Sequence, residues 1–490
     1  MKTNHHPLTL ADLRSDVLGI DTLVPLLDGT QRRYVFLDNA ASTPTFRSVL
    51  KSIEDFLPWY SGVHRGVGLK AVVATRAFDQ AHTIAGEFVG ADMRKNVVVF
   101  VKNTTEAVNK LANRFRLKQD DVVVTTMLEH HSNDLPWRKS CRTVHIGVAP
   151  DAGVDLTVLR SEMKRYGKSV KLVAVSGASN VTGVCSPIHE IAELAHAAGA
   201  KIFVDAAQLA PHRAIDIRAN DDPRHIDFLA YSAHKMYAPF GTGVLIGPKE
   251  FFAAGDPDLV GGGTVSFVGR AQRIDGGLED VDWAEAPQKE EAGSPNVVGA
   301  IALAKSLAVL REVGMDAIAE HERRLLEHAF SKLKKIQGVH LYGPTEDLSR
   351  KVGVIPFTVD GYDHALVATI LSVEGGIGVR NGNFCAQPYM RKLLNVSPER
   401  EKELRADRCD APMLPGMVRA SIGCYNSEED LDMFVDMVAR VVRRDYRGAY
   451  SVDPITNMYV VEGYDPVPHK YFSLMEGDEH VVPSGGEELA

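Results

Sequence analysis

Lys235 stands at the end of a run of reactive side chains, in the segment Tyr231–Lys235. Asp205 precedes it by about one βαβ unit. A lysine beside a hydroxyl and an imidazole can form a Schiff base with an aldehyde cofactor, and an aspartate at the end of a buried strand can keep a pyridine nitrogen protonated. Pyridoxal phosphate (PLP) chemistry needs this pair, because the protonated ring draws electrons away from a substrate carbanion. The types and spacing of these two residues therefore predict a PLP site.

A phosphate group has its own candidate donors. Thr104 and Thr105 follow the predicted strand Val97–Val101 and open a predicted helix. Free N–H groups at a helix N-terminus, together with the helix dipole, favour a phosphate dianion, although an ordinary N-cap uses the same residue types. Ser232 and His234 offer further donors, so we expect all four side chains to bind phosphate.

Polar side chains also follow other predicted strands. An imidazole such as His130 can stack on a flat heteroaromatic ring, and Asn180 could bind a ring oxygen or a substrate carboxylate. Gln208 lies one helical turn after Asp205 and could reach a ring hydroxyl. The adjacent His130 and His131 also suggest a metal site, but neighbours in sequence seldom converge on one ion and no HExxH motif is present. We therefore expect no metal.

The elements that must position these residues alternate between about residues 70 and 250. Strands are predicted at Val97–Val101, Asp121–Thr126, Lys171–Ser176, Lys201–Asp205, Ile226–Ser232 and Gly243–Gly247, and helices at Thr75–Phe88, Thr105–Phe115 and Pro187–Ala198. Val/Ile-rich strands separated by amphipathic helices indicate a mostly parallel sheet that is covered on both faces. Sites in such sheets gather at the carboxyl ends of the strands, so these side chains are expected to form one site.

A second, smaller α+β region is expected from about residue 315 to 445. The glycine-rich stretch Gly261–Gly277 predicts a loop, and Asn296–Val313 predicts a long helix that leads into this region. Within it, strands are predicted at Val352–Val359 and Val418–Gly423, and helices at His364–Glu374 and Glu428–Arg443. Residues 446–490 show no convincing periodicity beyond Met458–Val461 and end in a polar, acidic tail.

The composition is that of an ordinary soluble protein. The 490 residues are 45% hydrophobic and 24% charged, with a formal net charge of -9. The net negative charge argues against a nucleic-acid partner. The apolar runs are too short to span a membrane. With no signal-peptide core and five cysteines without CxxC spacing, a cytoplasmic protein without a disulfide framework is expected.

An ordered set of motifs resembles the class V aminotransferase-type PLP enzymes, and most of all their Suf-type cysteine desulfurase and selenocysteine lyase branch. The motifs are Leu37–Ala41, His64–Gly66, Thr104–Glu106, Glu129–His131, Ser179–Asn180, Val204–Gln208 and Ser232–Lys235. The resemblance covers about residues 35 to 440. It implies an α/β protein of PLP fold type I, with a large domain built on a seven-stranded, mostly parallel sheet and a smaller α+β domain.

The resemblance also implies a domain layout. Residues 1–34 would associate with the small domain, 35–300 would form the large PLP-binding domain and 301–445 the small domain. A charged, proline-rich insertion is expected at about 397–415, and 446–490 would be a C-terminal extension.

Roles for the residues of the large domain follow from the resemblance. Lys235 would form the Schiff base and move the substrate proton, His130 would stack on the ring, and Asp205 would bind its nitrogen. The remaining cofactor-binding residues would be Thr104, Thr105, Asn180, Gln208, Ser232, His234 and Ser294. Ser294 lies in a segment that reaches the phosphate of the other subunit, which implies a homodimer. Substrate would be bound by His64, Arg65, Asn180, Arg380 and Arg419.

Cys385 lies on a loop that resembles the catalytic loop of the desulfurases. By this resemblance its thiolate would attack the sulfur of L-cysteine, or assist release of selenium from L-selenocysteine, to leave L-alanine. A sulfur-acceptor protein would then be a partner. The family usually has two histidines just before this cysteine, whereas this chain has Asn383 and Phe384. A different class V activity, as an aminotransferase, epimerase or C–S lyase, is therefore the alternative, and a scaffold or sulfur-relay protein without turnover is a third hypothesis that Lys235 and Asp205 oppose.

Overall fold

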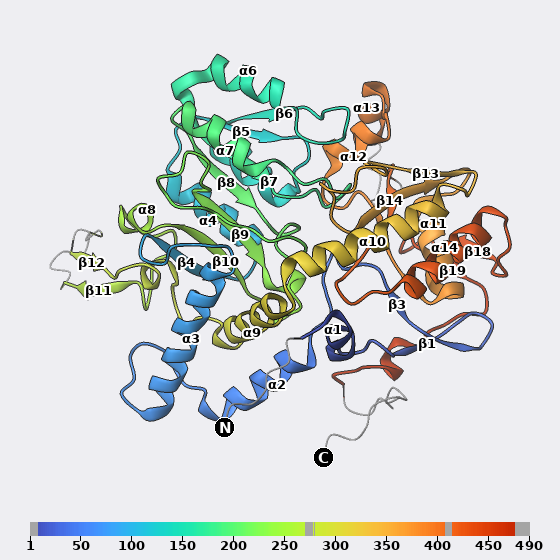
Figure 1. Ribbon diagram of the computed structural model, residues 1–490, viewed down its shortest axis with the longest axis horizontal. Helices are drawn as coiled ribbons and strands as arrows, with labels where there is room; N and C mark the ends of the chain where they lie inside the picture. The colour runs from blue at the N-terminus through green and yellow to red at the C-terminus, as the bar shows by residue number, and fades with distance from the viewer. Residues whose placement is uncertain (1–7, 270–277, 279, 407–413, 476–490) are drawn as a thin grey trace. The chain divides into compact units, whose positions relative to one another are not determined.

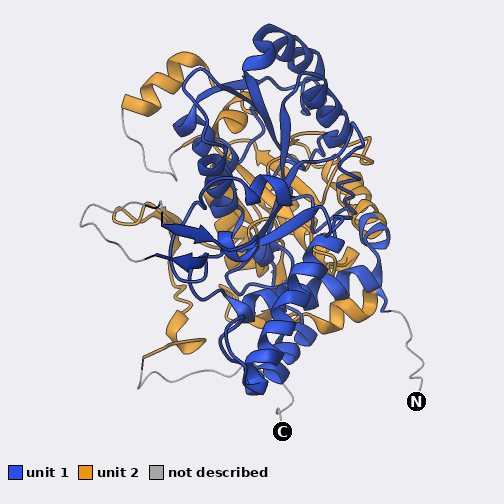
Figure 2. Ribbon diagram, turned by 90° about the vertical axis from the view of Figure 1, so that its left-hand side faces the viewer, with its two compact units in different colours: residues 1–9, 42–180, 184–319 blue, residues 10–41, 181–183, 320–490 orange. Residues whose placement is uncertain are grey.

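The computed structural model describes residues 8–269, 278, 280–406 and 414–475. The chain divides into two compact units, which Figure 2 shows in blue and orange. Unit 1 comprises Met1–Thr9, Ser42–Asn180 and Val184–Ala319, and unit 2 comprises Leu10–Ala41, Val181–Gly183 and Glu320–Ala490. Every helix in the described part of the chain is too short or too polar to span a lipid bilayer.

Unit 1 contains the alternating strands and helices (Figure 1). Its helices are α2 (Arg47–Phe56), α3 (Leu69–Glu87), α4 (Thr104–Phe115), α5 (Leu135–Ser140), α6 (Leu156–Tyr166), α7 (Ile188–Ala197), α8 (Lys249–Ala253), α9 (Val297–Val313) and the start of α10 (Met315–Leu333). Its strands are β4 (Asn96–Val101), β5 (Val122–Thr126), β6 (Arg142–Ile146), β7 (Val170–Ser176), β8 (Lys201–Asp205), β9 (Phe228–Ser232), β10 (Gly243–Pro248), β11 (Val265–Val268) and β12 (Val281–Trp283).

Seven of these strands form one sheet in the order β4-β10-β9-β8-β7-β5-β6. The neighbours from β9 to β6 are parallel, while β10 is antiparallel to both β4 and β9. Because β10 is antiparallel to both of its neighbours, β4 runs in the same direction as β9. The predicted seven-stranded, mostly parallel sheet is confirmed, and the carboxyl ends of six strands share one edge.

Both faces of this sheet are covered, which explains the continuous apolar runs in its sequence. Every residue of β4 is buried. Val97, Val99 and Val101 lie in a hydrophobic cluster with residues of α4 and with Trp137 of α5. The intervening side chains of β4 point to the opposite face of the sheet, as alternation along a strand requires.

Several elements of unit 1 differ from the sequence-based predictions. β6 was not predicted, because its residues are mostly only partly buried and it has no continuous apolar run. α3 begins six residues before the predicted Thr75. β11 falls inside the stretch Gly261–Gly277 that was predicted to be a loop, and it pairs with β12 as an antiparallel hairpin; residues 270–277 lie outside the described part.

Unit 2 is built on a four-stranded antiparallel sheet in the order β13-β14-β17-β16. Its strands are β1 (Leu23–Pro25), β2 (Gln31–Arg33), β3 (Val35–Phe36), β13 (Val339–Leu341), β14 (Val354–Val359), β15 (Ile377–Gly378), β16 (Arg380–Gly382), β17 (Met417–Ser421), β18 (Tyr450–Val452) and β19 (Tyr459–Val461). Its helices are α1 (Leu10–Asp16), the end of α10, α11 (His364–Gly375), α12 (Gln387–Leu393), α13 (Pro398–Ala406) and α14 (Glu428–Val442).

The residues of the expected insertion and of the expected C-terminal extension belong to unit 2. The stretch 397–415 contains α13, and its residues 407–413 lie outside the described part. The tail forms the hairpin β18–β19. It is attached to α11, since the carboxylate of Glu374 accepts hydrogen bonds from the N–H groups of Arg447 and Gly448 and from the Tyr450 hydroxyl. Residues 476–490 are not described.

Candidate active site

Asp205 is the last residue of β8, and Lys235 lies just after the end of β9. The two strands are parallel neighbours in the sheet. The Asp205 side chain is buried, and its Oδ1 accepts a hydrogen bond of 2.9 Å from the N–H of Ala207. Burial raises the pKa of Asp205, while the Ala207 N–H and the Lys235 ammonium act in the opposite direction. The structure therefore brings the two residues close enough for their charges to interact, at the edge of the sheet that the sequence predicted.

Thr104 and Ser232 join the first turn of α4 to the end of β9. The backbone N–H of Thr104 donates to Ser232 Oγ at 2.9 Å, and the two hydroxyls lie 2.8 Å apart. The turn itself is held by Asn103, whose side chain accepts a hydrogen bond from the N–H of Glu106 at 3.0 Å. Hydroxyls and helix N–H groups are thus concentrated at one place, as a phosphate site requires.

His130 is linked to this group of donors through a residue that the sequence analysis missed. Ser132 Oγ lies 2.7 Å from the hydroxyl of Thr105 and 3.0 Å from His130 Nδ1. The N–H of Ser132 also donates to Nδ1 at 3.1 Å. Because a backbone N–H can only donate, Nδ1 is an acceptor here, and in the neutral ring the hydrogen lies on Nε2.

Glu129 fixes the segment that carries His130. Its carboxylate is buried and accepts hydrogen bonds from the Thr126 hydroxyl, the Asn133 amide and both the N–H and the hydroxyl of Ser176. These contacts connect the ends of β5 and β7. Burial raises the pKa of Glu129 to about 7, against the effect of the donors around it. The sequence showed Glu129 within a motif but gave it no role.

The residues around Lys235 are held by main-chain contacts. The carbonyl of His234 accepts hydrogen bonds from the N–H and hydroxyl of Thr43 and from the hydroxyl of Ser42. Burial, and then the Lys235 ammonium, lower the pKa of His234 to about 4. Without a bound anion His234 is therefore neutral near pH 7, and its ring can donate a hydrogen bond to a phosphate.

The donor set around Lys235 fits a PLP molecule. A buried carboxylate such as Asp205 needs a cationic or hydrogen-bonding partner, and a protonated pyridine nitrogen would supply both. Thr104 and Ser232 offer hydroxyls, and Asn180 and Gln208 are buried amides near the same strand ends. The chemistry of these groups matches the phosphate, ring nitrogen and ring oxygen of that cofactor.

Three predicted site residues lie elsewhere in unit 1. His64, Arg65 and Ser294 line a cavity of about 440 Å³. None of the residues predicted to surround Lys235 is among the described residues that line it. The structure thus groups these three residues with one another, and their predicted roles stay predictions.

In unit 2, Asp38 brings together the two predicted substrate-binding arginines. Arg380 and Arg419 lie directly opposite each other on β16 and β17, a placement that like charges alone would destabilise. Asp38 Oδ2 lies 2.7 Å from Arg380 and Oδ1 lies 3.2 Å from Arg419, so the carboxylate compensates both charges. The Arg380 side chain is 51% exposed and that of Arg419 is 3% exposed. Only Arg380 is therefore accessible to a small molecule.

Phe384 and Cys385 form a strained turn against Arg419. Both have left-handed backbone conformations, with φ of 51° and 54°. The Phe384 ring lies 4.6 Å from the guanidinium of Arg419, a cation–π contact. Burial lowers the pKa of Arg419 to about 10, while Asp38 and the nearby Cys385 act against this shift. Cys385 is exposed, and it is one of four described cysteines, all free thiols; Cys409 lies outside the described residues.

A family model described as Aminotransferase class-V matches residues 35–434, most of the chain. The chain belongs to this family. Enzymes of the family depend on PLP, so the predicted family, the enzyme class and the fold class are confirmed.

A protein from Halalkalibacterium halodurans described as a probable cysteine desulfurase is 34% identical over 429 residues, which cover 84% of this chain and 95% of its own length. One from Staphylococcus aureus with the same description is 33% identical, over 87% of this chain and 97% of its own.

Solved structures agree with this family assignment. The apo structure of a cysteine desulfurase from Thermococcus onnurineus superposes with a TM-score of 0.74 at 31% identity, and it covers 91% of this chain and 100% of its own. A cysteine desulfurase from Escherichia coli gives a TM-score of 0.73 at 27% identity, over 90% of this chain and 100% of its own. The predicted fold is thus found in cysteine desulfurases of known structure.

Proposed function

We propose that this protein is a PLP-dependent cysteine desulfurase. It would remove sulfur from L-cysteine, or selenium from L-selenocysteine, and give L-alanine. The observation that carries the proposal is the placement of Cys385 in unit 2. This exposed thiol lies on a strained turn beside Arg419, and through Asp38 that arginine is tied to the accessible Arg380. A family enzyme of another activity would share the arginine clamp but has no need of Cys385.

Unit 1 would hold the cofactor. Thr104, Thr105, Ser232 and His234 would bind the phosphate, Asp205 the ring nitrogen and Gln208 the ring oxygen, with His130 stacked on the ring and Asn180 close to it. Bound PLP supplies the electron sink that makes the α-carbon of an amino acid acidic. Lys235 would hold the cofactor aldehyde and carry the α-proton. The hydrogen bond from Ser132 to His130 fixes the tilt of the imidazole.

Unit 2 would hold the substrate and take the sulfur. Arg380 would bind the substrate carboxylate in place of Asp38, in the two-pronged geometry that a guanidinium allows. The Cys385 thiolate would attack the substrate sulfur. A sulfur–sulfur bond forms, the carbon–sulfur bond of the substrate breaks, and the carbon takes up a proton to become the methyl group of alanine. Cys385 is left as a persulfide for transfer to an acceptor protein.

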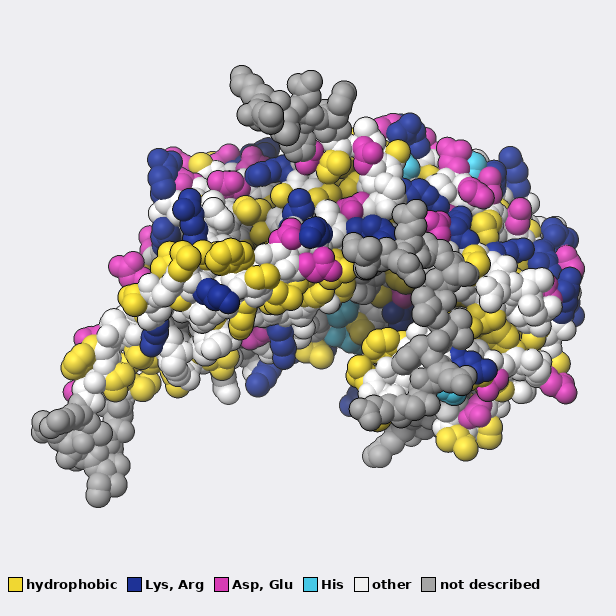
Figure 3. Space-filling view, turned by 90° about the horizontal axis from the view of Figure 1, so that it is seen from below, with side chains coloured by type: hydrophobic (Ala, Val, Ile, Leu, Met, Phe, Trp, Pro, Cys, Tyr) yellow, Lys and Arg dark blue, Asp and Glu magenta, His cyan; other side chains and the backbone are white. Residues whose placement is uncertain are grey.

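A homodimer completes the proposal. His64, Arg65 and Ser294 line their own cavity, which supports a role toward a second subunit. Figure 3 shows hydrophobic side chains along the left-hand part of the face in view. Large exposed hydrophobic residues of unit 1 include Phe267 and Val268 of β11. Such groups favour association with a partner.

The deciding experiment uses the PLP-loaded protein and L-cysteine. We expect equal amounts of alanine and sulfur, with one added sulfur atom on Cys385 by mass spectrometry. Cys385→Ser should keep PLP and lose turnover, while Cys141→Ser should keep both. Turnover that survives Cys385→Ser would refute the desulfurase.

One observation favours the alternative activity. Phe384 packs on Arg419 at the position where the family usually has a histidine beside the reactive cysteine. An apolar ring does not stabilise a thiolate as an imidazolium does. If no alanine forms but amino acids still change the absorbance of the bound PLP, the chain is an aminotransferase, epimerase or C–S lyase of the same family.

A further inference from the structure

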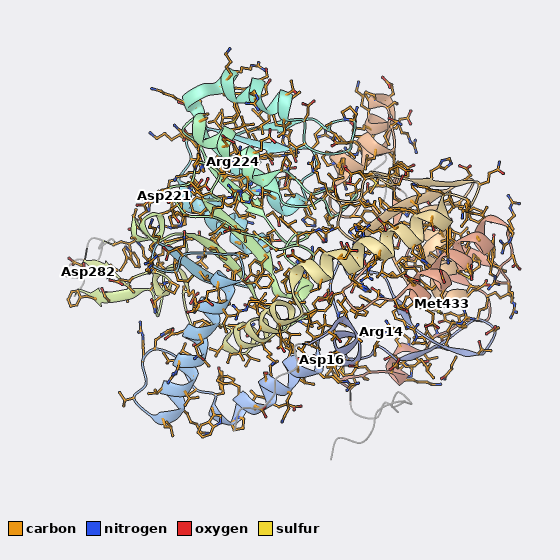
Figure 4. All side chains as sticks on the ribbon, in the orientation of Figure 1. Arg14, Asp16, Asp221, Arg224, Asp282 and Met433 are labelled. Carbon is orange, nitrogen blue, oxygen red and sulfur yellow. The ribbon has the colours of Figure 1, made fainter. Side chains whose placement is uncertain are left out.

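His196, His225 and Asp227 form a cluster away from Lys235, at the other end of β9. Asp227 directly precedes β9, and His196 lies in the last turn of α7. Figure 4 labels Asp221 and Arg224, which belong to the loop that leads to His225. One ligand atom from each of His196, His225 and Asp227 lies within 4.8 Å of the others. The proposed desulfurase chemistry uses none of the three.

The contacts of the two rings decide which nitrogen carries the hydrogen. His196 Nδ1 lies 2.7 Å from the carbonyl oxygen of Pro223, and His225 Nδ1 lies 2.6 Å from that of Asp222. A carbonyl oxygen can only accept, so both Nδ1 atoms must donate. In the neutral rings the lone pairs are then on the two Nε2 atoms. This is the arrangement in which a backbone carbonyl orients a metal-binding histidine.

Both Nε2 atoms face the same buried carboxylate. His196 Nε2 lies 2.7 Å from Asp227 Oδ2, and His225 Nε2 lies 3.2 Å from Oδ1. The ring centroids are 4.3 Å apart with an interplanar angle of 20°. In this metal-free arrangement, a proton on Nε2 lets each ring donate a hydrogen bond to the carboxylate. A divalent ion would take the place of these protons, because the three side chains converge on one point.

Lys201 occupies part of this position. Its ammonium lies 2.7 Å from Asp227 Oδ1, and its side chain is 48% exposed. It can therefore turn into solvent when a divalent ion takes its place. The backbone N–H of Ile202 also donates to Asp227 Oδ2 at 3.0 Å, and this contact fixes the carboxylate. The nearby Arg224 is paired with Glu193, so it does not compete.

We propose that His196 Nε2, His225 Nε2 and the Asp227 carboxylate bind one divalent transition-metal ion of the zinc class, with water as the fourth ligand. Nitrogen and carboxylate ligands at tetrahedral zinc lie about 3.3 Å apart, so the side chains would move by on the order of 1 Å. The ion would tie the end of α7 to the start of β9. The sequence analysis considered a metal only at the adjacent His130 and His131 and expected none, so it did not consider these three residues.

Metal titration of the full-length, PLP-loaded protein tests this proposal. The protein is first freed of metal with a chelator, and Zn²⁺ is then added during calorimetry and thermal unfolding. We expect one equivalent to bind and to raise the Tm. Co²⁺ added to the metal-free protein should give the strong visible absorption of a tetrahedral site, and Zn²⁺ added afterwards should abolish it.

Matched variants identify the ligands. His225→Gln and His196→Gln should each weaken Zn²⁺ binding at least tenfold, and folding is checked by circular dichroism. His189→Gln is the control, because its Nδ1 also faces a backbone carbonyl, that of Arg224, but it lies outside the cluster. Cys385→Ser should bind normally, which separates this site from the thiol.

The proposal is wrong if the protein binds no Zn²⁺ at millimolar concentration. It is also wrong if both cluster variants bind as well as His189→Gln. If one cluster variant does not fold, the other decides. Loss of desulfurase activity would leave this result untouched, because the two sites share no residue.

Discussion

At the scale of single residues, Asp38 determines how the two arginines can act. It neutralises a pair of like charges that β16 and β17 place opposite each other, and it leaves Arg380 exposed while Arg419 stays buried. A substrate carboxylate would therefore compete with Asp38 for Arg380. The buried Arg419 would act behind it, held by the Phe384 ring.

Arg380→Lys should raise KM for L-cysteine by roughly tenfold to a hundredfold with a smaller change in kcat, because a lysine cannot form the two-pronged contact. Steady-state kinetics measure the changes in KM and kcat separately. Arg391→Lys, on α12 and paired with Glu401, is the control and should behave like the wild type. An unchanged KM in Arg380→Lys would show that another group binds the carboxylate.

Phe384→His should increase the reactivity of Cys385 near neutral pH. It places an imidazole next to the thiol, which lowers the pH at which the thiolate forms, but it gives up a cation–π contact of about 0.5–2 kcal/mol. The rate of alkylation of Cys385 by iodoacetamide, measured against pH, should shift to lower pH. Phe384→Leu removes the ring contact without adding an imidazole, and an equal shift there would rule out this explanation.

At the scale of elements, the strand ends and the first turn of α4 create the cofactor site. Asn103 caps α4, and the N–H of Thr104 reaches Ser232 on β9. Glu129 connects β5, β7 and the turn η2 (His131–Asn133) that follows His130. The geometry of the site thus depends on hydrogen bonds between elements, not only on the residues that touch the cofactor.

Asn103→Ala should weaken PLP binding about fivefold. The first turn of α4 would lose its cap, which contributes about 1 kcal/mol, and its N–H groups would no longer be held toward the phosphate. Titration with PLP followed by absorbance gives the affinity. Asn103→Ser keeps a capping oxygen and should bind as the wild type does; equal weakening in both variants would mean that the cap is not the cause.

Glu129 should make stability depend on pH. Its pKa rises from 4.5 to about 7 in the folded chain, so the folded state keeps a proton that the unfolded state has lost. This contribution is complete below about pH 4.5 and is lost as the pH rises to about 7, a change of about 3 kcal/mol. In Glu129→Gln, the free energy of unfolding measured in urea should not decrease in this way as the pH rises. In Glu190→Gln, which changes an exposed residue, it should depend on pH as in the wild type. Parallel curves for Glu129→Gln would contradict the raised pKa.

At the scale of the whole molecule, the exposed hydrophobic side chains of unit 1 are consistent with the proposed homodimer. Phe267 on β11 is 61% exposed. Light scattering should give the mass of a dimer, and Phe267→Glu should shift the equilibrium toward the monomer at micromolar concentration. Ile455→Glu is the control, because Ile455 is 89% exposed on the C-terminal extension. A monomeric wild type would remove the role proposed for Ser294.

Much of the large sheet could be predicted because its inner strands are continuous apolar runs between amphipathic helices. β6 of this sheet and β11 of the separate hairpin could not, since strands that are partly buried or mostly exposed have no such pattern. The residues at the strand ends were identifiable from type and order. Asp38 and Ser132 received no role, because their importance lies in which side chains they bring together in space.

The position of β4 has a consequence for synthesis of the protein. β4 is the first strand of the large sheet along the chain, and its single neighbour in that sheet is β10, which ends at Pro248. A nascent chain therefore carries β4 as an unpaired apolar segment until β10 has left the ribosome, roughly 7–30 s later at ordinary rates of translation. During that interval a chaperone that binds extended apolar segments would find its target at Asn96–Val101, and folding of unit 1 would be completed only after release of that segment.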